Sequence, residues 1–499
     1  NALMDMYAKC GAISKSEEVF DKIRIHDIVS WNILISGYVQ HEWNGKALAC
    51  FEKMQLEGVC PDAFSFTCSL KACGNIGATN DGRKIHNDIA KKGLLESNIA
   101  IGNALLDMYA KCGLLAEALE IFKELHIPDV VSWTALISGY VDHKLCKEAL
   151  DCFDQMKLEG IAPNTITLAC SLRACGSIGD IEKGREIHSE LVGKGLLEEN
   201  DIVLDTTLVD MYSKIGFLLE AKYVFDTLGV QDVVACTALI AGYAAHEQEE
   251  EALNHFNQMQ LMGLSPSEFT YACILKACGS LGAVDMGRKI HCDIERKALL
   301  DNNLVVGTAL IDMYSKCGLL KEAQIIFDQL RVRDPITWNS LITGYSQLGE
   351  TEVVLGMLER MRADGNEPDA VTFLCIMNSC CHASLVEEGE MYFGAMRKCN
   401  GVTPALEHYT CMVDLFGRAG NLEKAVDMIE RMSFSSHLLM WHTILGACRS
   451  LGNADVGKQA FENAVNLDIN DPVAYVLMSQ IEAPHHHPRI GLNIRARYG

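Results

Sequence analysis

The side chains best suited to metal or redox chemistry are the 21 cysteines and 16 histidines of this 499-residue chain. Zinc and redox sites commonly place cysteines as C-x-x-C, and no two cysteines here have that spacing. Many recur instead at one place in successive segments, at Cys68 and Cys73, Cys170 and Cys175, Cys273 and Cys278, and Cys375 and Cys380. Because cysteine packs as a small apolar residue in a reducing compartment, we expect neither a disulfide framework nor a metal site.

The histidines offer one partial match to a catalytic motif. Zinc deaminases use H-x-E followed by P-C-x-x-C, and His188-Ser189-Glu190 supplies only the first part. The corresponding stretches before and after it read H-N-D and H-C-D, ending at Asp88 and Asp293. The run from His485 to His487 cannot share one helix face, and no G-x-x-x-x-G-K-(S/T) phosphate loop occurs. We therefore expect no enzymatic activity, no cofactor and no small-molecule substrate.

Polar side chains of another kind stand on otherwise apolar segments. In the 35 residues Val130–Asn164, apolar residues at Trp133, Leu136, Ile137 and Tyr140 have the spacing of one helix face. A second apolar stripe follows, and Gly160 and Pro163 end it. The first segment recurs as WNILISGY, CTALIAGY and WNSLITGY, each with Asn or Thr at one place. The pattern predicts a helical hairpin that needs neighbouring hairpins to bury its apolar faces.

An outer period organises these hairpins. D-M-Y recurs at intervals of about 102 residues, at Asp5, Asp107, Asp210 and Asp312, and then as D-L-F at Asp414. Each interval divides into units of 31, 35 and 36 or 37 residues. The short units are a truncated one ending at Asp27, then Ile99–Asp129, Ile202–Asp232 and Leu304–Asp334. The 35-residue units are Ile28–Asp62, Val130–Asn164, Val233–Ser267 and Pro335–Asp369, and the long units are Ala63–Asn98, Thr165–Asp201, Glu268–Asn303 and Ala370–Ala405.

Composition limits the classes of partner. Apolar residues make up 49% of the chain and charged residues 22%, as in ordinary folded proteins, and no apolar run reaches the roughly 20 residues that span a membrane. The formal charge of −23 disfavours non-specific nucleic-acid binding, which depends on basic surface. It does not exclude binding through bases with few phosphate contacts.

These repeats resemble the pentatricopeptide repeat (PPR) family, in particular its plant organellar PLS branch of alternating unit lengths, over roughly residues 1–483. The resemblance implies an all-α, right-handed α-solenoid of tandem helix-turn-helix repeats over residues 1–437. Leu406–His437 resembles the closing short repeat of editing-type members, and residues 438–483 resemble an incomplete E-type extension. Residues 484–499 match neither, and we expect a disordered tail. Because the chain begins part-way into a unit, we also expect further repeats before Asn1 and draw nothing about targeting.

In the family, the fifth and last residues of a unit together face one RNA base. By resemblance, the short units supply Asn1 with Asp27, Asn103 with Asp129, Thr206 with Asp232, and Thr308 with Asp334. The 35-residue units supply Asn32 with Asp62, Thr134 with Asn164, Thr237 with Ser267, and Asn339 with Asp369. A carboxylate accepts the ring N–H of U or G, and an amide donates to the ring nitrogen of A or C. In the family, fifth-position Thr goes with purines and Asn with pyrimidines, which implies U, U, any base, U, A, any base, G, purine, any base, G, U.

Alternative roles exist for these residues and for two further sets. An Asp or Asn before a helix is a normal N-cap, although this leaves the Asn and Thr of the first helices unexplained. The apolar second residues would stack on bases in the family, at Val29, Val131, Val203, Val234, Val305 and Ile336. One cation in each short unit is a candidate phosphate contact or a solvated charge near a helix end, at Lys9, Lys111, Lys214, Lys316 and Arg418.

The resemblance implies sequence-specific binding of single-stranded organellar RNA, in a mitochondrion or chloroplast with the mitochondrion favoured. The chain would select a cytidine for C-to-U editing, with a cytidine deaminase and accessory factors acting in trans at the extension and with no membrane partner. Deleting the extension is expected to abolish editing and leave RNA binding intact. Two alternatives remain open: a factor for RNA stabilisation, splicing or translation, and a tetratricopeptide-like scaffold that binds protein.

Overall fold

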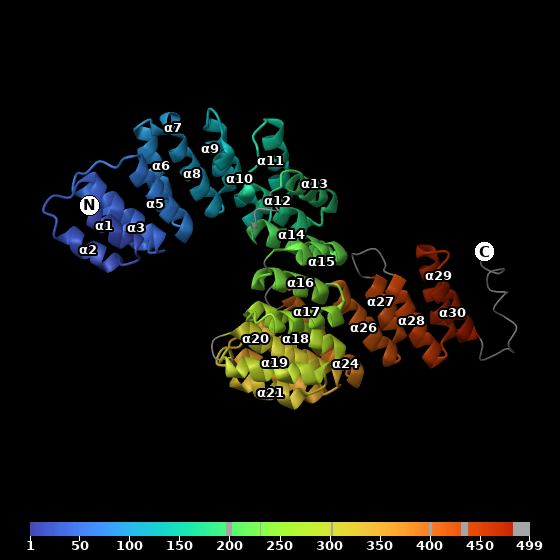
Figure 1. Cartoon of the computed structure of the whole chain (residues 1–499). Coiled ribbons are helices and arrows are strands. Elements are labelled where there is room, and N and C mark those ends of the chain that lie inside the picture. Colours follow the sequence, from blue (N-terminus) through green and yellow to red (C-terminus); the bar gives the residue numbers. More distant parts are fainter. Residues whose placement is uncertain (196–201, 230, 301–302, 399–401, 431–437, 483–499) are drawn as a thin grey trace. The chain divides into compact units, whose positions relative to one another are not determined.

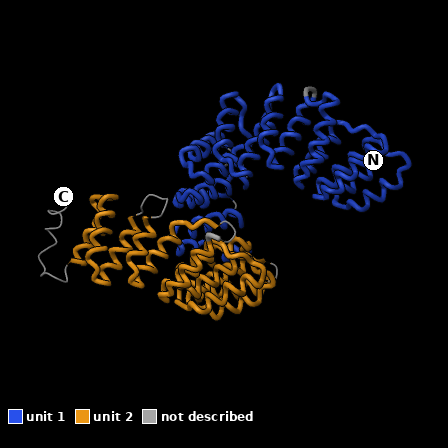
Figure 2. Tube along the Cα trace, turned by 180° about the vertical axis from the view of Figure 1, so that it is seen from behind, with its two compact units in different colours: residues 1–265 blue, residues 266–499 orange. Residues whose placement is uncertain are grey.

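The computed structural model describes residues 1–195, 202–229, 231–300, 303–398, 402–430 and 438–482, and all regular structure in these ranges is α-helix. The all-α fold class expected from the sequence is confirmed. The helices follow one another as antiparallel hairpins (Figure 1). The chain divides into two compact units, Asn1–Ser265 and Pro266–Gly499 (Figure 2).

The first unit contains helices α1 to α17. Its helices are α1 (Ala2–Lys9), α2 (Ile13–Asp21), α3 (Ile28–Gln40), α4 (Asn44–Leu56), α5 (Ala63–Ile76), α6 (Thr79–Lys91), α7 (Leu94–Ser97), α8 (Ile99–Lys111), α9 (Leu115–Glu124), α10 (Val130–Asp142), α11 (Cys146–Leu158), α12 (Thr165–Ile178), α13 (Ile181–Gly193), α14 (Ile202–Ile215), α15 (Leu218–Thr227), α16 (Val233–Ala245) and α17 (Glu249–Leu261). The first helix of each described repeat starts at the residue where the sequence period starts the repeat.

The second unit contains α18 to α30. Its helices are α18 (Glu268–Leu281), α19 (Val284–Arg296), α20 (Leu304–Lys316), α21 (Leu320–Gln329), α22 (Pro335–Gln347), α23 (Thr351–Ala363), α24 (Ala370–Ala383), α25 (Val386–Lys398), α26 (Leu406–Arg418), α27 (Leu422–Glu430), α28 (Leu438–Leu451), α29 (Ala454–Leu467) and α30 (Pro472–Glu482). None of the described helices in either unit is both long and apolar enough to cross a membrane.

Within each unit, the first helices of successive repeats lie against one another and form one layer. In the first unit α3 contacts α5, α5 contacts α8, α8 contacts α10 and α10 contacts α12. Each second helix packs on its own first helix and on the next one, as α9 does on α8 and α10. Phe–Trp pairs fix this contact: Phe122 on α9 meets Trp133 on α10 edge-on, with 4.6 Å between ring centroids. The equivalent pairs are Phe20 with Trp31 and Phe327 with Trp338.

The contact between a long repeat and the following short repeat explains the D-M-Y motif. The methionine is buried against two glycines of the long repeat: a Cβ on Gly82 would lie 2.6 Å from the sulfur of Met108, and one on Gly74 would lie 3.3 Å from the Met108 Cα. The tyrosine Tyr109 hydrogen-bonds His86 of the G-R-x-I-H motif at 2.9 Å. The same contacts recur around Met211 and Met313. This recurrence explains why the period of about 102 residues is so regular.

Most of the described cysteines are wholly or partly buried, and Cys10, Cys60 and Cys292 are exposed. Cys73, Cys175, Cys278 and Cys380 are fully buried, and burial raises the pKa of Cys73, Cys175 and Cys278 to about 12. Their thiols are therefore protonated and unreactive at neutral pH. No group of His, Cys, Asp or Glu side chains suited to holding a metal ion occurs in the described residues.

Candidate nucleic-acid interface

The last residue of each predicted base-reading pair is the N-cap of the next first helix. The Oδ1 atom of Asp27, Asp62, Asp129, Asn164, Asp232, Asp334 and Asp369 accepts the backbone N–H of the residue three positions on, at 2.8–2.9 Å. Ser267 caps α18 through its hydroxyl. The capping role considered from the sequence is therefore present. It also determines how the side chain is oriented, because the cap holds one oxygen and directs the second polar atom elsewhere.

In the pairs with asparagine, the fifth and last side chains touch directly. The amide Nδ2 of Asn32 lies 3.1 and 3.2 Å from the two carboxylate oxygens of Asp62. Asn339 donates to Asp369 at 3.0 and 3.1 Å, Asn103 to Asp129 at 3.1 Å, and Asn1 to Asp27 at 3.2 Å. These four pairs join residues 26 or 30 positions apart in the chain. The structure thus brings together residues that the sequence could only pair by resemblance.

A buried hydroxyl completes most of these contacts, and sequence reasoning missed it. Ser65 donates to Asn32 Oδ1 at 2.5 Å and lies 2.8 Å from Asp62 Oδ1. Ser132 and Thr372 make the same contacts with Asn103 and Asn339. The signal is Ser or Thr three residues after the last residue in seven of the eight pairs, the spacing of a capping box; Ala235 after Asp232 is the exception.

The threonine pairs are linked through this hydroxyl instead of by direct contact. Thr308 Oγ1 lies 2.8 Å from Thr337 Oγ1, which donates to Asp334 Oδ1 at 2.6 Å. Thr134, Thr167 and Asn164 form the equivalent chain at 2.7 and 2.8 Å.

One threonine pair differs from that arrangement. Thr206 hydrogen-bonds the carbonyl of Ile202 at 2.6 Å, and Asp232 caps α16, whose third residue is Ala235 and offers no hydroxyl. Thr237 ends the series in the first unit, and its expected partner Ser267 belongs to the second unit. In the closing short repeat Leu406–His437, the fifth residue Thr410 is described, and the last residue His437 lies outside the described residues.

Donated hydrogen bonds lower the pKa of two capping carboxyls, Asp62 and Asp129. Burial by itself would raise the pKa of the Asp62 carboxyl, but the Ser65 N–H, the Ser65 hydroxyl and the Asn32 amide lower the pKa below its ordinary value. The pKa of Asp129 is lowered in the same way, by Ser132 and Asn103 against the effect of burial. A carboxylate is therefore present at neutral pH to accept a hydrogen bond.

Within each unit, the second residues of the repeats form a row of exposed apolar side chains. Val29, Val131, Val203, Val234, Val305 and Ile336 are between 49% and 64% exposed, although their types favour burial. The row is broken in Leu406–His437, where the second residue is the exposed carboxylate Glu407.

The five predicted cations are not isolated charges. Each forms an i,i+4 ion pair with the aspartate of the D-M-Y or D-L-F motif, at 2.6–2.9 Å: Lys9 with Asp5, Lys111 with Asp107, Lys214 with Asp210, Lys316 with Asp312 and Arg418 with Asp414. Each pair is neutral overall. Sequence reasoning selected the cations and missed these partners, although the spacing of four residues signals them.

One cavity brings all these features together. It has a volume of about 660 Å³ and lies along α5, α8, α10 and α12 of the first unit. Its lining includes the pairs Asn103–Asp129 and Thr134–Asn164, the second residue Val131, and both Asp107 and Lys111, together with Lys71 of the long repeat. The layer of first helices therefore presents a groove with donors, acceptors, apolar side chains and charge.

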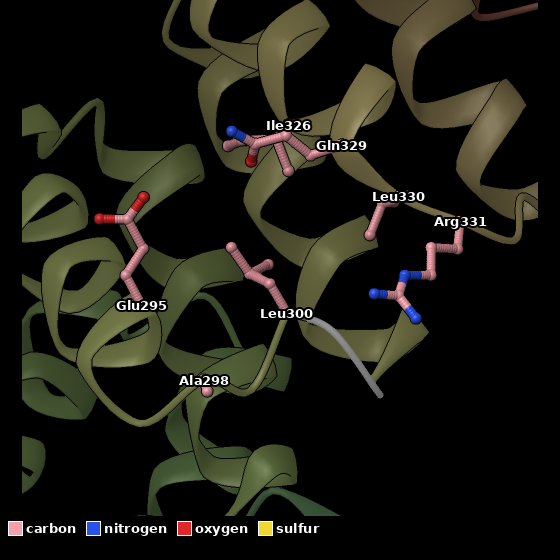
Figure 3. Close-up of a pocket in the computed structure, with 7 residues that line it drawn as sticks. All are labelled: Glu295, Ala298, Leu300, Ile326, Gln329, Leu330 and Arg331. Carbon is pink, nitrogen blue, oxygen red and sulfur yellow. The ribbon is translucent and has the colours of Figure 1, made fainter.

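A second cavity and the histidine motifs are separate from this groove. A cavity of about 420 Å³ in the second unit is lined by residues of α19, α21 and the adjoining loops, among them Glu295, Leu300 and Arg331 (Figure 3). None of the predicted site residues lines it. His188 and Glu190 of the H-x-E match have partners within the fold, Tyr212 for the histidine and Lys157 and Lys194 for the glutamate. The run His485–His487 lies outside the described residues.

The extension repeats the geometry of the array. His442 is the fifth residue of Leu438–Asp471, and its Nε2 hydrogen-bonds the carboxylate of Asp471, the last residue. Asp471 caps α30 through Val473 N–H at 3.0 Å. Sequence reasoning assigned no pair here, although the position of both residues follows from the same count.

The sequence matches the "PPR repeat family" at residues 26–75, 128–177, 231–280 and 333–382. It matches the "PPR repeat" at residues 1–28, 103–126, 308–334, 371–401 and 407–435. This chain belongs to the pentatricopeptide repeat family. A mitochondrial PPR-containing protein of Arabidopsis thaliana is 35% identical to the present PPR protein over 482 residues, which cover 96% of this chain and 69% of that protein. A chloroplastic PPR-containing protein of the same plant is 34% identical over 479 residues, covering 96% of this chain and 59% of that protein.

Solved structures agree on the fold. The crystal structure of PPR10 from maize has a TM-score of 0.60 at 18% identity, covering 96% of this chain and 80% of that one. PPR10 in complex with an 18-nt psaJ RNA element has a TM-score of 0.53 at 18% identity and the same coverage. The tandem helical repeats expected from the sequence are thus confirmed as a PPR α-solenoid fold. The Arabidopsis relatives are longer than this chain, which spans between 48% and 80% of their length.

Proposed function

We propose that this PPR protein binds single-stranded organellar RNA sequence-specifically, with one base at each short and each 35-residue repeat. The observation that carries the proposal is the contact between the fifth and last side chains across a distance of 26 or 30 residues, beside an exposed apolar row. N-capping alone would not place Asn32, Asn103 and Asn339 against the capping carboxylates. That PPR10 forms a complex with RNA on a similar fold supports the assignment.

The caps supply a physical basis for base choice. In Asp129 and Asn164 the cap engages Oδ1, so the atom left to face a ligand is Oδ2 in the aspartate and Nδ2 in the asparagine. The first accepts a hydrogen bond and the second donates one. Asp129 would therefore select a base with a ring N–H, U or G, and Asn164 a base with a ring acceptor, A or C.

The test is a titration at two salt concentrations of two RNAs. One carries U, U, any base, U, A, any base, G, A, any base, G, U, and the other exchanges U with C and G with A at the specified positions. We expect tight binding to the first and a loss of about 1–3 kcal/mol for each exchanged base. Equal, weak binding to both that disappears with salt would overturn the proposal and favour a protein-binding scaffold.

We further propose that the protein selects a cytidine for C-to-U editing and that the deaminase acts in trans. The closing short repeat and the extension are the features that favour editing over RNA stabilisation, splicing or translation. Side chains of α26 and α28, including Phe416 and Trp441, belong to one buried cluster. Deleting the extension would therefore uncover core surface, and exposed positions are a better test of docking.

Ile469 and Val476 are such positions, 67% and 52% exposed near and on α30. Changing both to glutamate is expected to reduce editing of a reporter RNA in the presence of deaminase, while RNA affinity changes less than about twofold. A parallel loss of RNA affinity would show that the extension contributes to the RNA surface. Unchanged editing would exclude this face as the docking surface.

A further inference from the structure

The strongest feature without an assigned role is the buried hydroxyl that follows and contacts five of the pairs. Ser65, Ser132, Thr167, Thr337 and Thr372 are all fully buried, and each lies within hydrogen-bond distance of both the fifth and the last side chain of the preceding repeat. A hydroxyl that only capped a helix would need no contact with the fifth residue of the repeat before it.

The hydroxyl removes an ambiguity in asparagine. An asparagine amide can point its oxygen or its nitrogen to a given partner. Asn32 directs Nδ2 to the Asp62 carboxylate and Oδ1 to the Ser65 hydroxyl. The opposite orientation would set Oδ1 against the carboxylate and is repulsive. One N–H and one lone pair of the amide therefore remain in fixed positions for a base.

In threonine pairs the same hydroxyl makes the connection itself. Thr337 donates its proton to Asp334 Oδ1 and can accept the proton of Thr308. This ordered chain leaves the lone pairs of Thr308 available as an acceptor at a fixed distance from the carboxylate. Two acceptors side by side suit guanine, whose N1–H and N2–H groups are neighbouring donors.

One repeat provides a natural comparison. Ile202–Asp232 has the same fifth and last residues as Leu304–Asp334, threonine and aspartate, but Ala235 occupies the place of Thr337. Thr206 is hydrogen-bonded to carbonyls of its own helix, at 2.6 Å to Ile202 and 3.2 Å to Val203. No hydroxyl of residue 235 can hold Thr206 to Asp232.

We propose that the hydroxyl three residues after each base-reading pair is a positioning residue for base specificity. Repeat Leu304–Asp334, which has it, discriminates guanine more sharply than Ile202–Asp232, which lacks it. The inference rests on the proposed RNA binding and deepens it. It adds a third position, contributed by the following repeat, to the two that determine base choice.

The experiment measures Kd of the full chain for RNAs that differ only at the base opposite each of these two repeats. In the unmodified protein, the ratio of Kd for A to Kd for G is expected to be about five- to tenfold larger at Leu304–Asp334 than at Ile202–Asp232, because one hydrogen bond is missing at Ile202–Asp232. Thr337→Ala should lower that ratio to the value at Ile202–Asp232. Ala235→Ser, which adds one oxygen atom, should raise the ratio at its own site.

Ser346→Ala is the matched control. Ser346 is a buried hydroxyl on the same helix α22 that donates to the Cys375 carbonyl at 2.9 Å, and the equivalent residue in the preceding 35-residue repeat is Ala244. Its change should leave both ratios unaltered. Circular dichroism and thermal unfolding establish that each variant is folded.

The outcomes separate the two proposals. Loss of base discrimination by the unmodified protein at all positions would overturn the RNA-reading function itself. Discrimination that is equal at both repeats, and unaffected by Thr337→Ala, would overturn the positioning role while base reading stands. A uniform loss of affinity for all four bases in Thr337→Ala, with a lower Tm, would reduce the hydroxyl to a helix cap.

Discussion

The neutral ion pairs on the first helices predict how the salt dependence of RNA binding can be changed. Lys111 and Lys214 lie 2.8 and 2.6 Å from Asp107 and Asp210, one helical turn earlier. While these pairs are intact, the aspartate neutralises the lysine charge that would otherwise attract a phosphate. Changing both aspartates to asparagine keeps the side-chain shape and frees both lysines, so RNA affinity at low salt should rise.

The magnitude follows from two established quantities. An exposed i,i+4 pair stabilises a helix by about 0.3–0.5 kcal/mol, so the double variant should lose at most about 1 kcal/mol of folding stability. Each new phosphate contact with single-stranded nucleic acid changes the slope of log K against log salt by about −0.7. Two contacts therefore steepen the slope by about 1.4, and the loss of affinity between 50 and 200 mM salt grows about sevenfold.

The assay is a fluorescence-anisotropy titration with one RNA at four salt concentrations. The control variant changes Asp81 and Asp88 to asparagine, because these residues pair with Lys84 and Lys91 on the second helix α6 and their loss changes the net charge equally. An equal steepening in the control would show a general charge effect. No steepening in either variant would refute the phosphate role of Lys111 and Lys214.

Three further predictions concern one base and the stability of the repeats. Asn164→Asp keeps a good N-cap but replaces the outward donor by an acceptor, so the base preferred at that repeat should change from A to G. The difference in binding free energy between the two RNAs, measured from their Kd values, should be about 1–3 kcal/mol. Gly139→Ala would place a Cβ 2.6 Å from the Ala110 Cβ and should destabilise by about 1–3 kcal/mol in urea unfolding, whereas Gly45→Ala, with open space around it, should stabilise by about 0.5–1 kcal/mol. Burial lowers the pKa of His86, His188 and His291, the histidines that contact tyrosines. Below the ordinary pKa of 6.5 the unfolded chain therefore binds more protons than the folded one, and the stability should fall as the pH falls through that region. The fall in Tm should be smaller when these three histidines are changed to asparagine.

The repeat architecture followed from the sequence because it is encoded several times over. The apolar spacing in Val130–Asn164 specifies two helices, and the glycine and proline at its end specify where they stop. The recurrence of D-M-Y then fixes the order of the repeats. The apolar spacing and the terminal glycine and proline lie within a single repeat, where a pattern in the chain translates directly into a helix face.

The hydrogen-bonded groups of the candidate interface were less accessible because they join different repeats. Ser65 acts on a pair whose members belong to the repeat before it, and a serine near a helix start is common enough to pass as a cap. The spacing of Lys111 and Asp107 predicts their ion pair. Its effect on the charge of the groove follows only from the structure, in which both residues line one cavity. Only family resemblance joined the fifth and last residues, because spacing alone gives no reason for residues 30 apart to touch.

The distribution of charge bears on how such a chain would recognise RNA. A net charge of −23, with each predicted groove cation held by an aspartate, leaves little long-range attraction for a phosphate backbone. Binding would then depend on short-range contacts with bases, made by the apolar row and by the paired polar side chains. Those contacts exist only where a matching base is present, so a weakly charged groove favours discrimination between RNA sequences over affinity for RNA in general. Freeing the lysines should therefore raise the affinity for matched and mismatched RNA by about the same factor, because a phosphate contact does not depend on the base, and the ratio between the two affinities should stay unchanged.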